Sequence, residues 1–228
     1  MHLLVARRFL LREMVGTGST GPVRRAWDLR DRRQVVVKRG GAGPDLDHPH
    51  LLPGRRVGDL VVLPLVRGGS AEQLLASRGI LPAERVAGLL DQLLEALSAL
   101  HEAGWVHGDV KPGNLLLEPT EAGPPHLWLA DLGSARRIGA PGPPDGTAGY
   151  VAPEARAGAP AHPRADLFAA GVTAAELLTG RPPRRPDDLP RGRLRPLLTA
   201  LIAVDPDRRP ESASKARALL EVGAAQRP

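Results

Sequence analysis

The first third of the chain alternates short apolar runs with polar and glycine-rich breaks. The runs are β-branched or apolar, and Gly, Asp and Pro separate them, which favours a small antiparallel sheet. Strands are expected at 9–15, 23–27, 34–39 and 60–65. Residues 9–66 are therefore predicted to be rich in strands.

The apolar spacing changes after this region to a helical period. Between Pro82 and Gly104, apolar residues recur every three or four positions, and Pro82 lies where a helix would begin. Shorter helices are predicted at 164–178, 194–203 and 213–222. The pattern therefore predicts an α+β fold with two lobes, in which a small sheet precedes a mainly helical body.

Composition limits the chemistry of the chain. With 228 residues and 42% hydrophobic content, it can bury a substantial core. The chain contains no cysteine, which excludes disulfides and Cys-based zinc or nucleophile chemistry and agrees with a reducing compartment. The first charges follow a short apolar run, opposite to the order in a signal peptide, and no apolar stretch approaches the ~20 residues of a membrane span. We therefore expect a cytoplasmic protein without a membrane anchor.

The excess of positive charge does not by itself indicate a nucleic-acid partner. The net charge is +6, but the basic pairs are scattered and aromatic residues make up only 3% of the chain. Nucleic-acid surfaces gather basic residues on one face, often with aromatics between them. We interpret pairs such as Arg136-Arg137 and Arg208-Arg209 as solvated surface and expect no nucleic-acid binding.

Three polar segments carry the most specific chemical pattern. Residues 107–114 read His-Gly-Asp-Val-Lys-Pro-Gly-Asn, residues 131–133 read Asp-Leu-Gly, and residues 146–154 read Gly-Thr-Ala-Gly-Tyr-Val-Ala-Pro-Glu. An Asp and an Asn five residues apart, with a Lys between them and a second Asp downstream, supply charges and oxygen ligands for phosphoryl transfer on a divalent metal. A surface turn would rarely produce all these residues in this order.

These segments resemble eukaryotic-type (Hanks-type) bacterial Ser/Thr protein kinases, in an unusually short form. The resemblance implies ATP- and Mg²⁺-dependent transfer of the γ-phosphoryl group to a Ser or Thr hydroxyl of a protein substrate. By the same resemblance, Asp109 accepts the proton of the substrate hydroxyl, Lys111 steadies the transferred group, and Thr147 hydrogen-bonds both of them. Asn114 and Asp131 are the implied Mg²⁺ ligands.

The resemblance also implies one kinase domain over residues 1–228, with a small lobe at about 1–66, a large lobe at about 67–228 and an ATP site between them. Residues 16–23 form a glycine-rich run whose backbone amides can approach phosphates, although an ordinary glycine hairpin has the same local pattern. Residues 63–66 align with the hinge that binds adenine, with Leu63 as gatekeeper, although a strand running into a turn fits equally well. The implied nucleotide-binding residues are Gly16, Gly18, Gly21, Val23, Val36, Lys38, Leu63, Pro64, Val66 and Leu116, and Lys38 also counts as catalytic.

Two other functional classes were weighed against a protein kinase. His-Gly-Asp followed by Asn is also typical of aminoglycoside- and choline-type phosphotransferases, which usually lack the downstream Ala-Pro-Glu segment. That segment ends here at Glu154, which is expected to pair with Arg209, while Asp166 is expected to bind the catalytic-loop backbone. The third class is a nucleotide-binding pseudokinase that acts as an interaction module, against which the retained Lys38 and Asp109 argue.

The departures from the family pattern carry further predictions. Gly108 replaces the Arg that would receive an activation-loop phosphate, so we expect no phosphate-driven switch. Residues 39–47 are too few and too rich in Gly for a regular helix, so the regulatory helix and its Glu partner for Lys38 are predicted to be missing. We favour a return of Asp45 or Asp47 to Lys38. An acid from an activating partner or a second copy of the chain, or phosphate alone, are the alternatives.

The large lobe is also predicted to be shortened. Residues 184–193 form a Pro- and Arg-rich connection where the family normally has a helix that docks substrates. Substrate docking is therefore expected to differ from that of longer relatives.

Overall fold

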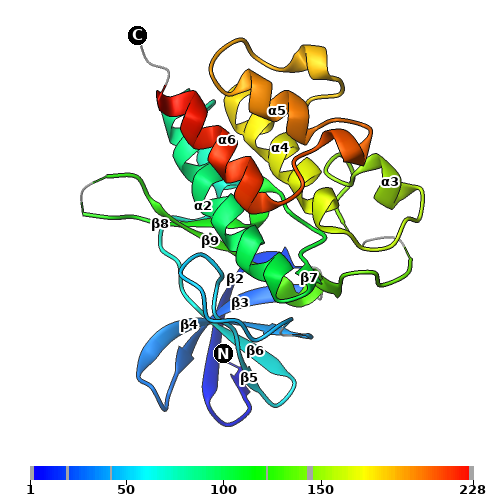
Figure 1. The fold of residues 1–228 in the computed structure, drawn as a ribbon. Helices are drawn as coiled ribbons and strands as arrows, with labels where there is room; N and C mark the ends of the chain where they lie inside the picture. The colour runs from blue at the N-terminus through cyan, green and yellow to red at the C-terminus, as the bar shows by residue number, and fades with distance from the viewer. Residues whose placement is uncertain (1–2, 19–20, 42, 122, 143–145, 226–228) are drawn as a thin grey trace.

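The computed structural model describes residues 3–18, 21–41, 43–121, 123–142 and 146–225. In Figure 1, a twisted sheet formed by the early part of the chain lies against a helical body formed by the later part. The α+β architecture with a small sheet lobe and a helical large lobe, predicted from the sequence, is thus confirmed. Ser19 and Thr20, at the tip of the glycine-rich run, lie outside the described residues.

The small lobe is built on a six-stranded antiparallel sheet with the order β1-β2-β3-β4-β6-β5. Its strands are β1 (Leu4–Val5), β2 (Phe9–Gly18), β3 (Gly21–Asp28), β4 (Arg33–Arg39), β5 (Arg55–Val57) and β6 (Leu60–Pro64). The four predicted strands correspond to β2, β3, β4 and β6. The other two have two and three residues, which is too short to give a period in the sequence.

The two faces of β4 have different surroundings because side chains alternate along a strand. Val35 and Val37 are buried with Phe9 in a small apolar cluster on one face of the sheet. Val36 and Lys38 therefore lie on the opposite face, and Lys38 is only 5% exposed. The alternation directs Lys38 away from the apolar cluster.

The segment between β4 and β5, residues 40–54, is called the β4–β5 linker below. At the residues of this linker that the structure describes, there is no helix, as the sequence predicts. The linker instead runs to the large lobe, where Leu51 is buried in the main core. Two backbone hydrogen bonds, from the Leu52 amide to the Leu129 carbonyl and from the Leu129 amide to the His50 carbonyl, fix its end.

The large lobe is mainly helical. Its helices are α1 (Ala71–Arg78), α2 (Ala83–Glu102), α3 (Pro153–Arg156), α4 (Pro163–Thr179), α5 (Arg195–Leu201) and α6 (Ala213–Ala225). Four of them, α2, α4, α5 and α6, match the predicted helices. Within the described ranges, none combines the length and the apolar character that crossing a membrane requires.

Short strands connect these helices near the lobe interface. They form two antiparallel pairs, β7 (Trp105–Val106) with β10 (Arg136–Arg137) and the hairpin of β8 (Leu115–Glu118) with β9 (His126–Leu129). The polar segments singled out in the sequence lie at the ends of these strands: residues 107–114 between β7 and β8, and residues 131–133 after β9. The strand pairs therefore bring the two segments together.

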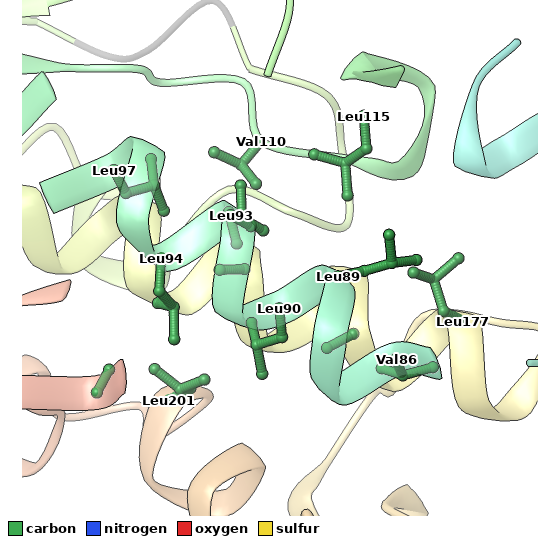
Figure 2. Packing of buried hydrophobic residues seen from close by; sticks show 14 of the residues in the cluster. Val86, Leu89, Leu90, Leu93, Leu94, Leu97, Val110, Leu115, Leu177 and Leu201 are labelled. Atoms are coloured by element: carbon green, nitrogen blue, oxygen red, sulfur yellow. The ribbon is translucent and has the colours of Figure 1, made fainter. Parts of the chain in front are cut away.

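Helix α2 forms the centre of the main core. Its inward residues include Leu93 and Leu97, and Figure 2 shows Val110 and Leu115 beside this face of the helix. Leu97 and Val110 are fully buried. Burial of a Leu or Val side chain contributes roughly 1.5–3 kcal/mol. The apolar members of the 107–115 segment thus anchor it on α2 and leave its polar members free for the site.

The connection between α4 and α5 contains only a single 3-10 turn (Pro186–Asp188). Residues 184–193 are all described and include no α-helix, as the sequence predicts. The Asp188 carboxylate accepts hydrogen bonds from the amides of Arg184 and Arg185. The shortened connection is therefore an ordered loop.

Candidate active site

Asp166 organises the backbone at the start of the catalytic segment. Its carboxylate accepts hydrogen bonds from the amides of His107 (2.7 Å) and Gly108 (2.9 Å), and His101 Nε2 lies 2.8 Å from it. Burial alone would raise the pKa of Asp166, but the hydrogen bond and charge of His101 and the Gly108 amide outweigh it, so the pKa is lowered. The expected binding of the catalytic-loop backbone by Asp166 is present.

His107 connects the catalytic segment to the strand that leads into Asp131. Its Nδ1 accepts the Asp109 amide (3.2 Å), and its Nε2 lies 2.9 Å from the Ala130 carbonyl oxygen. This pattern assigns the proton to Nε2 of a neutral ring. The Ala130 amide in turn donates to the Asn114 carbonyl oxygen. These bonds hold the two polar segments in a fixed relation.

Asp109 lies at the centre of a dense polar network and is only 4% exposed. One carboxylate oxygen accepts the Thr147 amide (2.9 Å) and the Thr147 hydroxyl (2.8 Å). The other accepts Lys111 Nζ (2.7 Å) and Asn114 Nδ2 (3.1 Å). Lys111 Nζ also donates to Thr147 Oγ1. The structure thus brings together four of the residues singled out in the sequence.

Lys38 crosses from the small lobe to the second polar segment. Its ammonium group forms an ion pair with the Asp131 carboxylate, and both side chains are buried. Asp131 has a left-handed backbone conformation (φ 65°, ψ 48°), which is uncommon for a residue other than Gly. A Cβ atom added at Gly18 would lie 3.4 Å from the Asp131 carboxylate. The glycine-rich strand pair, Lys38 and Asp131 therefore meet at one place.

The expectation that Asp45 or Asp47 pairs with Lys38 is wrong in this structure. Both acids are exposed, while Leu46 between them packs against the main core. Exposure alternates along these three residues, so Leu46 faces the core while the carboxylates on either side of it face solvent. Lys38 takes its acidic partner from the large lobe instead.

The predicted adenine-binding residues lie on segments that adjoin this site. Val36 and Leu63 are opposite each other in the β4–β6 pairing, and Pro64 ends β6. Val66 lies two residues after Pro64. Further along, the Gly69 carbonyl accepts a hydrogen bond from the Leu117 amide, and Ser70 forms a β-bridge with Leu116. This pairing places the hinge beside the strand that carries Leu116.

The remaining predicted nucleotide-binding residues lie on the strand pair that carries the glycine-rich run. Gly16 is opposite Val23, and Gly18 is opposite Gly21. A Cβ atom added at Gly18 would lie 3.4 Å from Val23 Cγ2, whereas one added at Gly16 or Gly21 would meet nothing within 4 Å. The run therefore forms a hairpin next to Asp131.

The activation segment is held at its end by the expected ion pair. Arg209 binds both carboxylate oxygens of Glu154 (2.6 and 2.8 Å) and donates to the backbone carbonyls of Ala203 and Arg164. Its side chain is fully buried and lies over the Phe168 ring. Arg209 was grouped with solvated surface pairs in the sequence, and its neighbour Arg208 fits that description, but Arg209 does not.

Arg136 has a role that the sequence did not indicate. It was interpreted as surface charge, yet its guanidinium donates to three consecutive backbone carbonyls, those of Ala140, Pro141 and Gly142. Gly108, where the family has an Arg, has a positive φ of 79°. The signal for Arg136 was its place three residues after the Asp-Leu-Gly segment, where the activation segment begins.

A second contact between the activation segment and α4 involves Tyr150. Its hydroxyl donates a hydrogen bond to the Glu176 carboxylate. Burial, and then the hydrogen bond with Glu176, raise the pKa of Tyr150 above its ordinary value. Burial likewise raises the pKa of Glu176, with a further contribution from the charge of Glu72. The residues before Ala-Pro-Glu are thus fixed to the large lobe.

Comparison with known proteins agrees with this geometry. A family model described as the protein kinase domain matches residues 58–221. Serine/threonine-protein kinase PkaA of Streptomyces coelicolor is 31% identical over 281 aligned residues, which cover 94% of this chain and 50% of that protein. The kinases PknL and PknA of Mycobacterium tuberculosis are 33% identical over 208 residues and 31% over 209, with 79% and 77% of this chain and 51% and 48% of those proteins covered.

The chain spans about half the length of these curated relatives. The family model nevertheless matches well over half of the chain, including all three polar segments. The chain therefore belongs to the protein kinase family.

Proposed function

We propose that this protein is an ATP- and Mg²⁺-dependent serine/threonine protein kinase. The observation that supports this best is the buried network in which Asp109 binds Lys111, Asn114 and Thr147 together. The similarity to kinases named for serine and threonine supports the acceptor class. We further propose that residues 1–228 form one kinase domain.

Asp109 is the proposed base for the substrate hydroxyl. The bonds from Thr147 and Lys111 hold its carboxylate in one orientation, so that it can accept the proton from a Ser or Thr hydroxyl. Lys111 also brings a positive charge to the place where negative charge develops on the transferred phosphoryl group. Thr147 binds both Asp109 and Lys111, so the relative position of these two side chains depends on the position of the activation segment.

The residues present fit a Mg²⁺ ion. Asp131 offers a carboxylate and Asn114 an amide oxygen, both of the kind that Mg²⁺ prefers. The Asn114 amide nitrogen donates to the backbone and side chain of Asp109, which leaves its oxygen for the metal. No cluster of three or more His, Cys, Asp or Glu side chains in the described part of the chain could hold a metal, so nucleotide and water oxygens would complete the shell. Bound Mg²⁺ would neutralise charge on the phosphates.

Lys38 must change partners in this proposal. Its ion pair with Asp131 keeps the ammonium group buried at the site, in the place where phosphate oxygens would arrive. We propose that Lys38 would bind the α- and β-phosphates of ATP, which would leave the Asp131 carboxylate to hold the metal. Gly16, Gly18, Gly21, Val23, Val36, Leu63, Pro64, Val66 and Leu116 are the proposed remaining nucleotide contacts.

The described residues of the activation segment are proposed to be held in place without a phosphate. Arg136 binds backbone carbonyls of this segment directly, and Gly108 offers no positive charge for a phosphate. An acid from an activating partner or a second copy of the chain is the alternative for Lys38, but Lys38 pairs with Asp131 of the same chain here, and phosphate oxygens would replace that carboxylate when ATP binds. We therefore propose that a single chain is active, which predicts a specific activity independent of enzyme concentration.

The decisive experiment is incubation with labelled ATP, Mg²⁺ and a generic protein such as casein. We expect label on the protein, and a loss of roughly 10²–10⁴-fold in Asp109→Asn. Asp187→Asn, a change at an exposed loop acid, is the matched control and should leave the rate unchanged.

Two other outcomes of the same experiment would contradict the proposal. Transfer to an aminoglycoside but not to protein would show a small-molecule phosphotransferase. Nucleotide binding without turnover, equal in Asp109→Asn and the parent, would show a pseudokinase that acts as an interaction module.

A further inference from the structure

The β4–β5 linker contacts the large lobe along most of its length. Leu46 and Leu51 pack on the main core, and that core also contains Leu132. The backbone bonds between the linker and Leu129 fix its far end. The linker therefore follows the chain from Leu129 to Gly133, which includes the proposed metal ligand.

Two glycines of the linker make the closest of these approaches. A Cβ atom added at Gly43 would lie 2.1 Å from the Leu132 carbonyl oxygen and 2.6 Å from Leu132 Cβ, which is impossible without movement. One added at Gly133 would lie 3.1 Å from the Gly41 carbonyl oxygen. Backbone therefore rests on backbone here, with no room for side chains. Gly43 also has a positive φ of 72°.

We infer that the linker takes over the positioning of the metal loop, residues 131–133, and that Gly43 is a positioning residue for Asp131. Asp131 has a left-handed backbone that other contacts must stabilise, and the linker closes over the two residues that follow it. A short, fixed linker thus does the work of a packed helix.

This inference rests on the proposed function only in treating Asp131 as a metal ligand. The test therefore measures the nucleotide-free protein. Amide hydrogen exchange at Ala135, which donates to the Leu132 carbonyl oxygen (3.0 Å), reports the order of the turn that Leu132 begins. In Gly43→Ala we expect this exchange to accelerate about tenfold or more, because the clash opens the local structure.

The matched control is Gly58→Ala. Gly58 also has a positive φ (61°), but an added Cβ would meet nothing within 4 Å. Both variants carry the same kind of backbone strain, and only one pushes on the metal loop. Equal exchange at Ala135 in the two variants would overturn the inference. A difference in exchange in a protein that shows no phosphoryl transfer would uphold it while contradicting the proposed function.

A second variant covers the case in which Gly43→Ala does not fold. Leu46→Ala loosens the linker without a clash, and Leu75→Ala on α1 is its control, since both side chains are partly buried against the same core. We expect Leu46→Ala to accelerate amide exchange at Ala135. It should also raise the Mg²⁺ concentration for half-maximal activity about threefold, which corresponds to roughly 0.7 kcal/mol. No difference between Leu46→Ala and Leu75→Ala in exchange would contradict the inference.

Discussion

The two lobes differ in where their charged site residues find partners. In the large lobe, Asp109 and Asp166 are bound by groups of the same lobe, and Arg209 reaches Glu154 within it. In the small lobe, Lys38 is equally buried but is paired with Asp131, across the lobe interface. The charged site residues of the large lobe are thus held by that lobe itself, whereas the charged site residue of the small lobe depends on a contact with the large lobe.

The same contrast explains which parts of the family pattern this chain retains. The family model begins at residue 58, after the β4–β5 linker, and continues almost to the end of α6. The helix missing from the small lobe can be dispensed with if Lys38 obtains its partner elsewhere. The bonds around Asp109 and Asp166 have no such substitute in the described residues, because each is made inside one buried network.

The largest effect is expected from a test of which acidic residue pairs with Lys38. We expect Asp131→Asn to reduce phosphoryl transfer by roughly 10²–10³-fold, since it removes a charge from the site. Asp45→Ala and Asp47→Ala should each change the rate by less than about twofold, because both acids are exposed. Steady-state assays of the two linker variants decide the matter, because Asp131→Asn also removes the proposed metal ligand. A strong loss of activity in either linker variant would show that the acidic partner of Lys38 comes from the β4–β5 linker.

The ion pairing inside the large lobe can be tested at Arg209. Replacing it with Ala leaves the Glu154 carboxylate without its buried partner, which typically costs about 3–5 kcal/mol. For a chain of this size, that is a fall in melting temperature of about 6–20 °C. Arg208→Ala is the control, since its pair with Asp205 is on the surface. Equal melting temperatures in the two variants would contradict the role of the buried pair.

The contacts of Arg136 provide a test within the activation segment. Arg136→Ala removes the bonds to the carbonyls of residues 140–142, and we expect kcat/KM to fall about tenfold. Arg137→Ala, which removes a guanidinium that covers the Trp105 ring instead, should have a smaller effect. Phosphatase treatment of the parent protein should leave its rate unchanged. A rate that depends on phosphorylation would contradict ordering by Arg136.

The small lobe has its own buried ion pair, between Arg8 and Asp28, and its stabilising effect should be lost in acid. The hydrogen bond from Arg8 lowers the pKa of Asp28 to about 2, against the opposing effect of burial and with help from the amides of Asp31 and Arg30. Because the folded state favours the charged form, this stabilisation is present above the ordinary pKa of 3.8 and is lost as the pH falls through about 2.

Melting temperatures of the parent and Asp28→Asn should therefore differ most near pH 6 and converge toward pH 2. Asp59→Asn, at an exposed acid whose pair with Arg39 is on the surface, should run parallel to the parent. A gap between the parent and Asp28→Asn that stays constant in this range would show that Asp28 does not titrate as described.

The fold could be predicted wherever one face of an element is buried over several turns or residues. Helix α2 and strand β4 carry clear periods, and their bounds agree with the prediction within a few residues. The short strands β1, β5, β7 and β10 contain two or three residues each and leave no period to detect. They form because neighbouring segments bring their backbones into register.

The site could be located from motifs, but not all of its contacts could. Asp166 and the Glu154–Arg209 pair followed from the order of the segments. The pairing of Lys38 with Asp131 and the role of Arg136 did not, because they depend on the path of the β4–β5 linker and of the activation segment in space. Local sequence shows a charge at each position, while the binding of Arg136 to three carbonyls is a property of the folded chain.

The most direct test of the whole account is a crystal structure with a non-hydrolysable ATP analogue and Mn²⁺ in place of Mg²⁺. Anomalous scattering would locate the metal. We predict a peak within bonding distance of the Asp131 carboxylate and the Asn114 amide oxygen, with Lys38 on the phosphates and Asp109 facing the terminal phosphoryl group. A metal and nucleotide bound away from these side chains, or Asp109 and Asp131 on separate surfaces, would contradict it.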